Sequence, residues 1–168
     1  TPDVAQRMVH TLRFRGPDGH GDWYAPDGRV WFGHSRLAII DVAHGQEPMP
    51  NEDASVWVTF NGEIYNHLAL RAELEALGHT FRTRCDTEVV PIGYREWGAQ
   101  GLLERLQGMF GLAIYDIARQ KFLLARDRLG IKPMYWSLAD DVLLFGSEIK
   151  AILQHPLKRS IRPDKTVF

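Results

Sequence analysis

The sequence predicts an α+β fold in which antiparallel sheets are packed between layers of helices. Residues 55–61 place apolar side chains at a period of two, as a strand does, and residues 66–78 then place leucines at the period of a helix. Four short strand patterns follow one another between residues 109 and 145, with turn residues between them. Consecutive strands favour antiparallel sheets, and separate helices pack as layers on the sheet faces. An α+β sandwich is the simplest arrangement of these elements.

Each element has a local signal. Residues 1–3 (TPD) form an N-cap followed by proline, and Asn66 and Gly78 are the expected first and last boundaries of the leucine-rich helix. Pro91 predicts that its helix starts late or bends, because an interior proline costs about 3 kcal/mol. Ser147 is the expected cap of the last helix. The expected helices cover residues 1–12, 66–78, 86–97 and 147–153, and the expected strands cover 31–33, 37–40, 55–61, 80–83, 109–116, 121–126, 134–137 and 142–145.

Composition limits the function classes. The 168 residues are 45% hydrophobic and 24% charged, which suits one globular domain spanning residues 1–168. The net charge of -1 gives no electrostatic reason to expect nucleic acid or an anionic membrane as a partner. We find no apolar run of membrane-spanning length and no signal-peptide pattern. Cys85 is the only cysteine, so we expect no intramolecular disulfide and no metal site, and a cytoplasmic location fits best.

The pair Asn61-Gly62 is the strongest single indication of chemistry. A strand over residues 55–61 would deliver Asn61 to a sheet end, where its amide and a neighbouring backbone N–H can stabilise an oxyanion. Gly62 leaves that N–H unobstructed because it has no Cβ. The alternative is a type I′ hairpin turn, which Asn-Gly also favours. The helical pattern that follows weakens the turn, since a hairpin needs a second strand there.

Seven sequence blocks occur in an order and spacing that identify a family. The chain resembles the class II glutamine amidotransferase domain of asparagine synthetases. That family has the N-terminal nucleophile hydrolase fold, so the resemblance implies a four-layer αββα sandwich with two antiparallel sheets. The blocks are RGPDG (15–19), HSRLAIID (34–41), NGEIYNH (61–67), DTEV (86–89), GMFGLAIYD (108–116), RDRLGIKPMY (126–135) and FGSEIKA (145–151).

The resemblance implies hydrolysis of glutamine to glutamate and ammonia. Arg36 corresponds to the arginine that pairs with the substrate α-carboxylate, a task that suits a planar guanidinium. An isolated arginine beside a strand would otherwise indicate a structural ion pair. Asp86 matches the carboxylate that accepts the α-ammonium, and by its position it could equally be a helix cap. These two residues would bind the zwitterionic end of an amino acid.

The remaining site residues follow from the same resemblance. Asn61 and Gly62 take the oxyanion role, and Glu63 lines the same pocket. The wall beside the substrate would be formed by residues that also read as an ordinary core strand. They are Leu37, Ala38, Ile39 and Ile40.

The nucleophile of the family is a cysteine at the N-terminus of the mature chain, where it begins the first strand. The 168 residues contain neither that N-terminal cysteine nor that first strand. Thr1 is rejected as a substitute because it reads as a helix cap. Cys85 has no free amine and no histidine partner visible in sequence, so we interpret it as a packed side chain or a bystander at the pocket rim. It stands where the family more often has serine, and Phe14 stands where relatives commonly have histidine. The 168 residues alone are therefore expected to be inactive.

Ammonia would pass from this domain to a separate synthetase domain. The resemblance implies that this second domain uses ATP and Mg. There an acyl-adenylate such as aspartyl-AMP accepts the ammonia. The 168 residues contain no Ser-Gly-Gly-x-Asp-Ser loop for pyrophosphate, and no cofactor is expected in this domain. A homodimer is one expectation for the whole protein. The alternatives are an amidotransferase serving another acceptor in a biosynthetic cluster and a catalytically dead scaffold.

Overall fold

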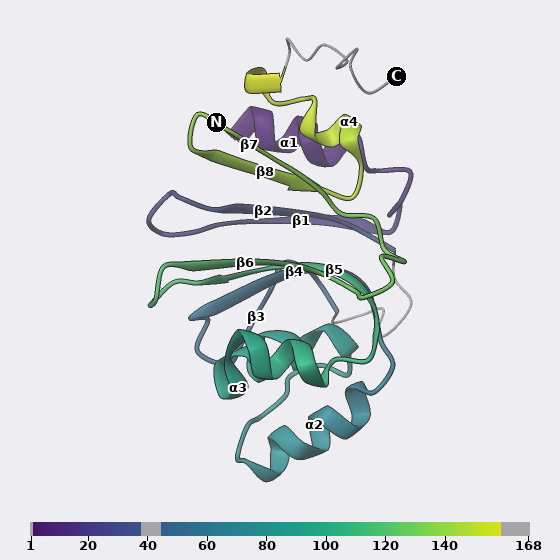
Figure 1. The fold of residues 1–168 in the computed structure, drawn as a ribbon, viewed down its shortest axis with the longest axis vertical. Coiled ribbons are helices and arrows are strands. Elements are labelled where there is room, and N and C mark those ends of the chain that lie inside the picture. The colour runs from purple at the N-terminus through teal and green to yellow at the C-terminus, as the bar shows by residue number, and fades with distance from the viewer. Residues whose placement is uncertain (1, 38–44, 159–168) are drawn as a thin grey trace.

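The computed structural model describes residues 2–37 and 45–158 as a four-layer αββα sandwich. In Figure 1 the helices α1 and α4 cover one side, two β-hairpins and a larger sheet form the middle layers, and α2 and α3 cover the other side. The α+β prediction is confirmed. The elements are α1 (Pro2–His10), β1 (Gly19–Tyr24), β2 (Trp31–Arg36), β3 (Met49–Pro50), β4 (Val56–Ile64), α2 (His67–Ala76), η1 (Asp86–Glu88), α3 (Val89–Arg105), β5 (Gly108–Asp116), β6 (Lys121–Arg126), β7 (Tyr135–Ala139), β8 (Val142–Gly146), α4 (Ile149–Ile152) and η2 (Pro156–Lys158).

The two middle layers differ in their pairing. The larger sheet has the order β3-β4-β5-β6, with β4 and β5 central and antiparallel. Within the described residues, the other layer consists of the β1–β2 and β7–β8 hairpins, which are not hydrogen-bonded to one another. Aromatic contacts join these hairpins instead, since the rings of Phe32 in β2 and Phe145 in β8 lie 6.0 Å apart.

Strand β4 is covered on both faces. Val56, Val58 and Phe60 face α2 and α3 in the largest hydrophobic cluster. On the opposite face Trp57 stacks on Trp23 of β1, with ring centroids 4.6 Å apart. The period of two is therefore confirmed, but the strand is not half-buried as its alternation suggests, because the second face lies between two sheets.

The helices on the larger sheet begin and end for the expected reasons, with two differences. Gly78 has a φ of 97° just after α2, a conformation that favours glycine. Pro91 lies in the first turn of α3, where its missing N–H costs nothing, so the late start is confirmed. The α3 helix continues past Trp97 to Arg105 through a kink at Gly98, whose φ is 70°. Asn66 occupies the N-cap position of α2 without a capping hydrogen bond from its side chain.

Two local predictions are wrong. Residues 80–83 form no strand, because the Glu88 carboxylate binds the N–H groups of Arg82 and Thr83, both at 2.8 Å, and so replaces a ladder partner. Glu148, rather than Ser147, is at the N-cap of α4, which has no side-chain capping bond. Strand β1 was not expected, and the strand expected at residues 37–40 lies largely outside the described residues.

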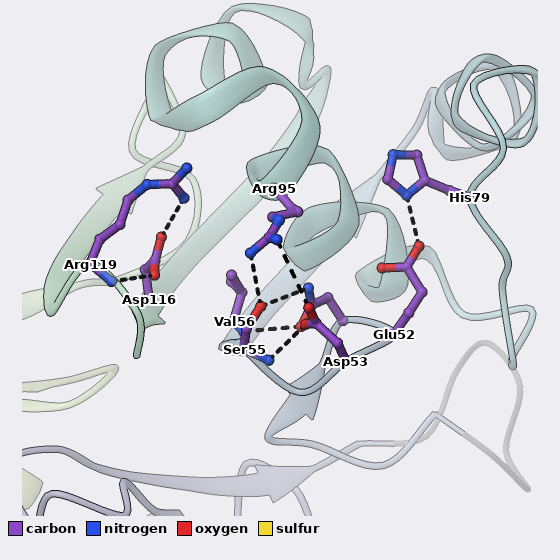
Figure 2. Close-up of polar contacts among 9 residues, drawn as sticks. Glu52, Asp53, Ser55, Val56, His79, Arg95, Asp116 and Arg119 are labelled. Atoms are coloured by element: carbon purple, nitrogen blue, oxygen red, sulfur yellow. Dashed lines mark hydrogen bonds and ion pairs between the residues drawn. The ribbon is translucent and has the colours of Figure 1, made fainter.

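The first end of β4, at Val56, is fixed by polar contacts within the preceding loop and to α3 (Figure 2). Asn51 Oδ1 accepts a hydrogen bond from Val56 N at 3.0 Å, and Arg95 on α3 donates to Ser55 Oγ at 3.2 Å. His79 contacts Glu52 in the same loop, with 2.7 Å between His79 Nδ1 and Glu52 Oε1. These contacts hold one end of β4, and the candidate site lies toward the other end. In the part of the chain that the structure describes, no helix is long and apolar enough to cross a membrane.

Candidate functional site

A cavity of about 740 Å³ lies between the layers and collects most of the predicted site residues. Its size is in the range of small-molecule sites. The described site residues that line it are Arg36, Leu37, Asn61, Gly62, Glu63 and Asp86. Ala38, Ile39 and Ile40 lie outside the described residues, so the structure says nothing of the wall that they would form.

Asn61 points into the space between the sheets. Side chains alternate along β4, and Asn61 and Glu63 share the face of Trp57, which packs against β1. Asn61 lies directly opposite Gly111 of β5, and a glycine there leaves no side chain beside the amide. The Asn61 Nδ2 atom is 3.4 Å from Ser147 Oγ, its hydrogen-bond acceptor at the end of β8.

The backbone N–H of Gly62 points to the open edge of β4. Tyr65 N, just past the strand, donates to Gln107 O, so the odd-numbered residues of β4 bond to β5 and the even-numbered N–H groups point to the opposite edge. On that edge Phe60 N donates to Glu47 Oε2 at 2.6 Å and Ile64 N donates to Asp86 Oδ2 at 2.8 Å. Gly62 lies midway between them, and no acceptor in the described ranges bonds its N–H on that edge. Within the described part of the chain, this donor is therefore available to a ligand.

Both locations that the sequence suggested for Asn61-Gly62 are wrong. The pair is neither at a sheet end nor in a hairpin turn, because β4 continues to Ile64 in register with β5. The glycine also has a structural cause, since a Cβ on Gly62 would lie 2.1 Å from Met109 O. The close approach of β5 is therefore by itself a reason for glycine at position 62.

Asp86 holds the strand that carries the oxyanion candidates. It is buried, at 4% exposure, and its Oδ2 accepts the Ile64 N–H described above. It is not a helix cap, because the N-cap of η1 is Cys85 and no side chain caps it. Burial, followed by the negative charge of Asp86, raises the pKa of Glu63 above its usual value. The two acids thus face the same part of the cavity.

Arg36 provides positive charge on the other side of the cavity. It ends β2, is partly buried, and its backbone carbonyl accepts a hydrogen bond from Asp18 N at 3.0 Å. Burial, followed by the charge of Arg36, lowers the pKa of His34 to about 4, so this histidine is neutral at pH 7. A cation and a carboxylate, Arg36 and Asp86, therefore line one cavity together with Asn61 and Gly62.

Sequence reasoning missed three largely buried polar groups in the cavity wall. They are His34, Glu47 and Thr87. Glu47 Oε2 is 3.5 Å from His34 Nδ1, and Glu47 Oε1 is 3.1 Å from Thr87 Oγ1. Residues 34 and 87 fall within two of the sequence blocks, but no local pattern marks Glu47, whose partners lie 13 and 40 residues away.

Cys85 and Phe14, which differ from the residues common in the family, make packing contacts that need no catalytic role. Cys85 is buried, and its Sγ lies 3.6 Å from Asp86 Oδ1 and 3.5 Å from Thr87 Oγ1. Burial raises the pKa of the thiol to about 11, which suits a packed side chain rather than a nucleophile. Phe14 is exposed, and Lys150 Nζ lies 3.8 Å from its ring centroid as a cation–π contact.

Two further sequence blocks are tied into the fold near the cavity. Arg15 of the first block donates to Glu148 of the last block at 2.8 Å. The buried Asp127 carboxylate accepts backbone N–H groups from Phe110, Ile131 and Lys132 at 2.9 to 3.2 Å. It thereby fixes the loop that carries Lys132 to the cavity wall.

Comparison with known proteins decides the family. A family model described as "Glutamine amidotransferase domain" matches residues 1–167. The chain belongs to this family. The amidotransferase domain is 43% identical over 152 residues to asparagine synthetase [glutamine-hydrolyzing] 3 of Bacillus subtilis, covering 89% of this chain and 24% of that protein. It is 44% identical over 147 residues to asparagine synthetase [glutamine-hydrolyzing] 3 of Arabidopsis thaliana, covering 86% and 24%.

Solved structures support the fold of the amidotransferase domain. A glutamine phosphoribosylpyrophosphate amidotransferase from B. subtilis matches with a TM-score of 0.74 at 21% identity, over 90% of this chain and 40% of that one. A structure described as the allosteric regulatory enzyme of purine biosynthesis matches with a TM-score of 0.78 at 22% identity, over 92% and 41%. The chain spans about a quarter of the length of the curated relatives.

Proposed function

We propose that this amidotransferase domain is the glutaminase part of a longer asparagine synthetase-like enzyme. It binds glutamine and releases ammonia for an acyl-adenylate, such as aspartyl-AMP, on a separate domain that uses ATP and Mg. The observation that carries the proposal is the Gly62 N–H, which has no acceptor among the described residues, beside the Asn61 amide and in one cavity with Arg36 and Asp86. The identity to glutamine-hydrolysing asparagine synthetases supports the same substrate.

Each group has one task in this proposal. Arg36 binds the α-carboxylate of glutamine through its planar guanidinium, and Asp86 accepts hydrogen bonds from the α-ammonium. Asn61 and Gly62 donate to the carboxamide oxygen as it becomes negative. Glu63 lines the pocket between them. The wall of Leu37, Ala38, Ile39 and Ile40 is part of the proposal, and only Leu37 among these is described.

The nucleophile is proposed to be a cysteine on a strand that precedes Thr1. Its thiolate attacks the carboxamide carbon, the C–N bond breaks, ammonia leaves after taking up a proton, and water then hydrolyses the thioester. The cavity offers a place for such a strand, because it extends between β2 and β8 and reaches Met8 and Leu144. The Trp31 Nε1–H in its wall is buried without an acceptor in the described part of the chain.

The test uses the full-length protein, with glutamate and ammonia measured from glutamine, and asparagine measured when aspartate and ATP are added. Production of all three supports the proposal. Glutamine hydrolysis without asparagine points to another acceptor, and no hydrolysis at all points to a scaffold.

The 168-residue chain is expected to be inactive by itself. Ammonia release by this chain that is lost in Cys85→Ala would overturn the assignment of the nucleophile. The homodimer and the cytoplasmic location remain predictions, which sedimentation and cell fractionation test.

A further inference from the structure

Glu47 connects the two halves of the candidate site. It lies between the described residues 45–46 and β3, and its side chain is 8% exposed. Its Oε2 accepts the N–H of Phe60 at 2.6 Å, and its Oε1 lies 3.1 Å from the Thr87 hydroxyl. Phe60 is the residue before Asn61, and Thr87 is the residue after Asp86. One carboxyl group thus bonds the segment carrying the oxyanion donors to the segment carrying the acid.

The second link between these segments is the bond from Ile64 N to Asp86 Oδ2 at 2.8 Å. The stretch from Asn61 to Glu63 is therefore fixed to η1 at both of its ends, once through Glu47 and once through Asp86. Past the short β3, the described residues provide no other strand on this edge of β4. Removing either carboxyl group frees one end of the stretch.

We infer that Glu47 is a positioning residue, whose carboxyl group sets the distance between the oxyanion donors of β4 and the Asp86 carboxylate. The inference rests on the proposed glutaminase function. Glu47 acts through Phe60 and Thr87 and need not touch glutamine. A displacement of about 1 Å at a reacting centre can cost on the order of 100-fold in rate, so small movements at either end of the stretch matter.

The surroundings of Glu47 favour its protonated form. Burial, which outweighs its two hydrogen bonds, raises the pKa of Glu47 to about 8, and the negative charge of Asp86 adds to this while Arg36 opposes it. The other groups that face it are the neutral His34 ring, the Thr87 hydroxyl and the protonated Cys85 thiol. At pH 7 the side chain is mostly neutral. Its ionisation would place a second negative charge beside Asp86 and near the developing oxyanion.

Glutamine is the natural test residue, because it has the shape of a protonated glutamate and does not ionise. We compare Glu47→Gln and Glu47→Ala in the full-length protein, with Glu52→Gln, which changes a carboxyl group in the His79 contact, as the matched control. The measurements are kcat and KM for glutamine hydrolysis from about pH 6 to pH 9.5. Glu47→Ala should lower kcat by about tenfold or more with a smaller change in KM.

Wild type should lose kcat as pH rises through about 8. Glu47→Gln should keep kcat within a few-fold of wild type at pH 7 and should show less of this decline. Glu52→Gln should follow the wild-type profile. A Glu47→Ala enzyme with a kcat within twofold of wild type would overturn the inference, even if its thermal midpoint falls. A Glu47→Gln profile that declines as wild type does would also overturn it.

A second measurement separates this inference from the proposed function. The folded state binds the Glu47 proton more tightly than the unfolded chain, so wild type loses stability as pH rises from the ordinary pKa of 4.5 to about 8. Glu47→Gln removes this loss, and its thermal midpoint should gain on wild type across that interval. If the Glu47→Gln midpoint shows this gain but wild type has no glutaminase activity, the result contradicts the proposed function and not the inference about Glu47. A midpoint difference that does not change with pH contradicts the buried carboxyl on which the inference stands.

Discussion

The Asp86 carboxylate bonds the Ile64 backbone N–H at 2.8 Å, two residues beyond Gly62 in the same strand. Asp86 therefore serves the strand and, in the proposed function, the ammonium of glutamine. The two roles require different chemistry. Bonding to Ile64 needs only an acceptor oxygen, whereas an ammonium is bound most strongly by a negative charge.

Asp86→Asn separates these roles. Asparagine keeps an acceptor for Ile64 N, so the thermal midpoint should stay within a few degrees of wild type, while KM for glutamine should rise by roughly 10- to 150-fold. Asp86→Ala should also lower the midpoint, because it leaves the Ile64 N–H buried and unpaired. Steady-state kinetics and thermal denaturation of both variants provide the check, and an unchanged KM in Asp86→Asn removes the residue from the substrate site.

Arg36→Ala should weaken glutamine binding by about 1.5–3 kcal/mol, because the substrate carboxylate loses its charge-assisted hydrogen bonds. KM should rise more than kcat falls, if Arg36 binds substrate and transition state equally. Arg36→Lys is the matched variant: it keeps the charge but not the planar fork, and it should recover part of the affinity. The same KM in all three proteins would show that Arg36 has only a structural role.

Asn61→Ala should cut kcat by about 10²–10³ with a modest change in KM, since the bond to the substrate oxygen strengthens as charge develops. Asn61→Asp has nearly the same shape and places a negative charge beside the oxyanion, so it should be at least as damaging. Ser147→Ala removes only the acceptor of the Asn61 amide and should cost much less. A near-normal kcat for Asn61→Asp, with the midpoint unchanged, would contradict the oxyanion assignment.

Asp127 should stabilise the fold at neutral pH and lose this effect in strong acid. Burial alone would raise the pKa of Asp127, but backbone N–H donors, with those of Lys132 and Ile131 first, lower it below the ordinary 3.8. The contribution is present above pH 3.8 and is lost as pH falls through the lowered pKa. Asp127→Asn should therefore lower the thermal midpoint at pH 7, by on the order of 5 °C, and the difference should shrink in strong acid. A difference that does not change with pH would contradict this assignment.

Much of the fold could be predicted because its signals are local. The leucine stripe before Gly78, the proline in the first turn of α3 and the alternation of Val56, Val58 and Phe60 each depend on near neighbours in sequence. Strand β1 was missed because its sequence, GHGDWY, has few strand-forming residues. It is extended because it pairs with β2 along its whole length and packs Trp23 on Trp57.

Sequence could predict several residues that gather in one cavity, but less of how they are arranged there. Asn61, Gly62 and Asp86 do line one cavity, but the sheet end expected at Asn61 is not there, because the pairing with β5 runs on to Ile64. Glu47 could not be found from its neighbours in sequence, because its burial depends on segments that meet only in the folded chain.

The carboxyl groups on the edge of β4 also bear on solubility. An open strand edge is a template on which another chain can add a strand and start aggregation. Past the short β3, the donors of Phe60 and Ile64 are occupied by the side chains of Glu47 and Asp86, which leave the Gly62 N–H between them. A single ligand oxygen can reach one isolated donor, but a foreign strand needs several in a row. Among the described residues, the edge therefore leaves room for a contact with a single ligand atom while it resists pairing with a second polypeptide.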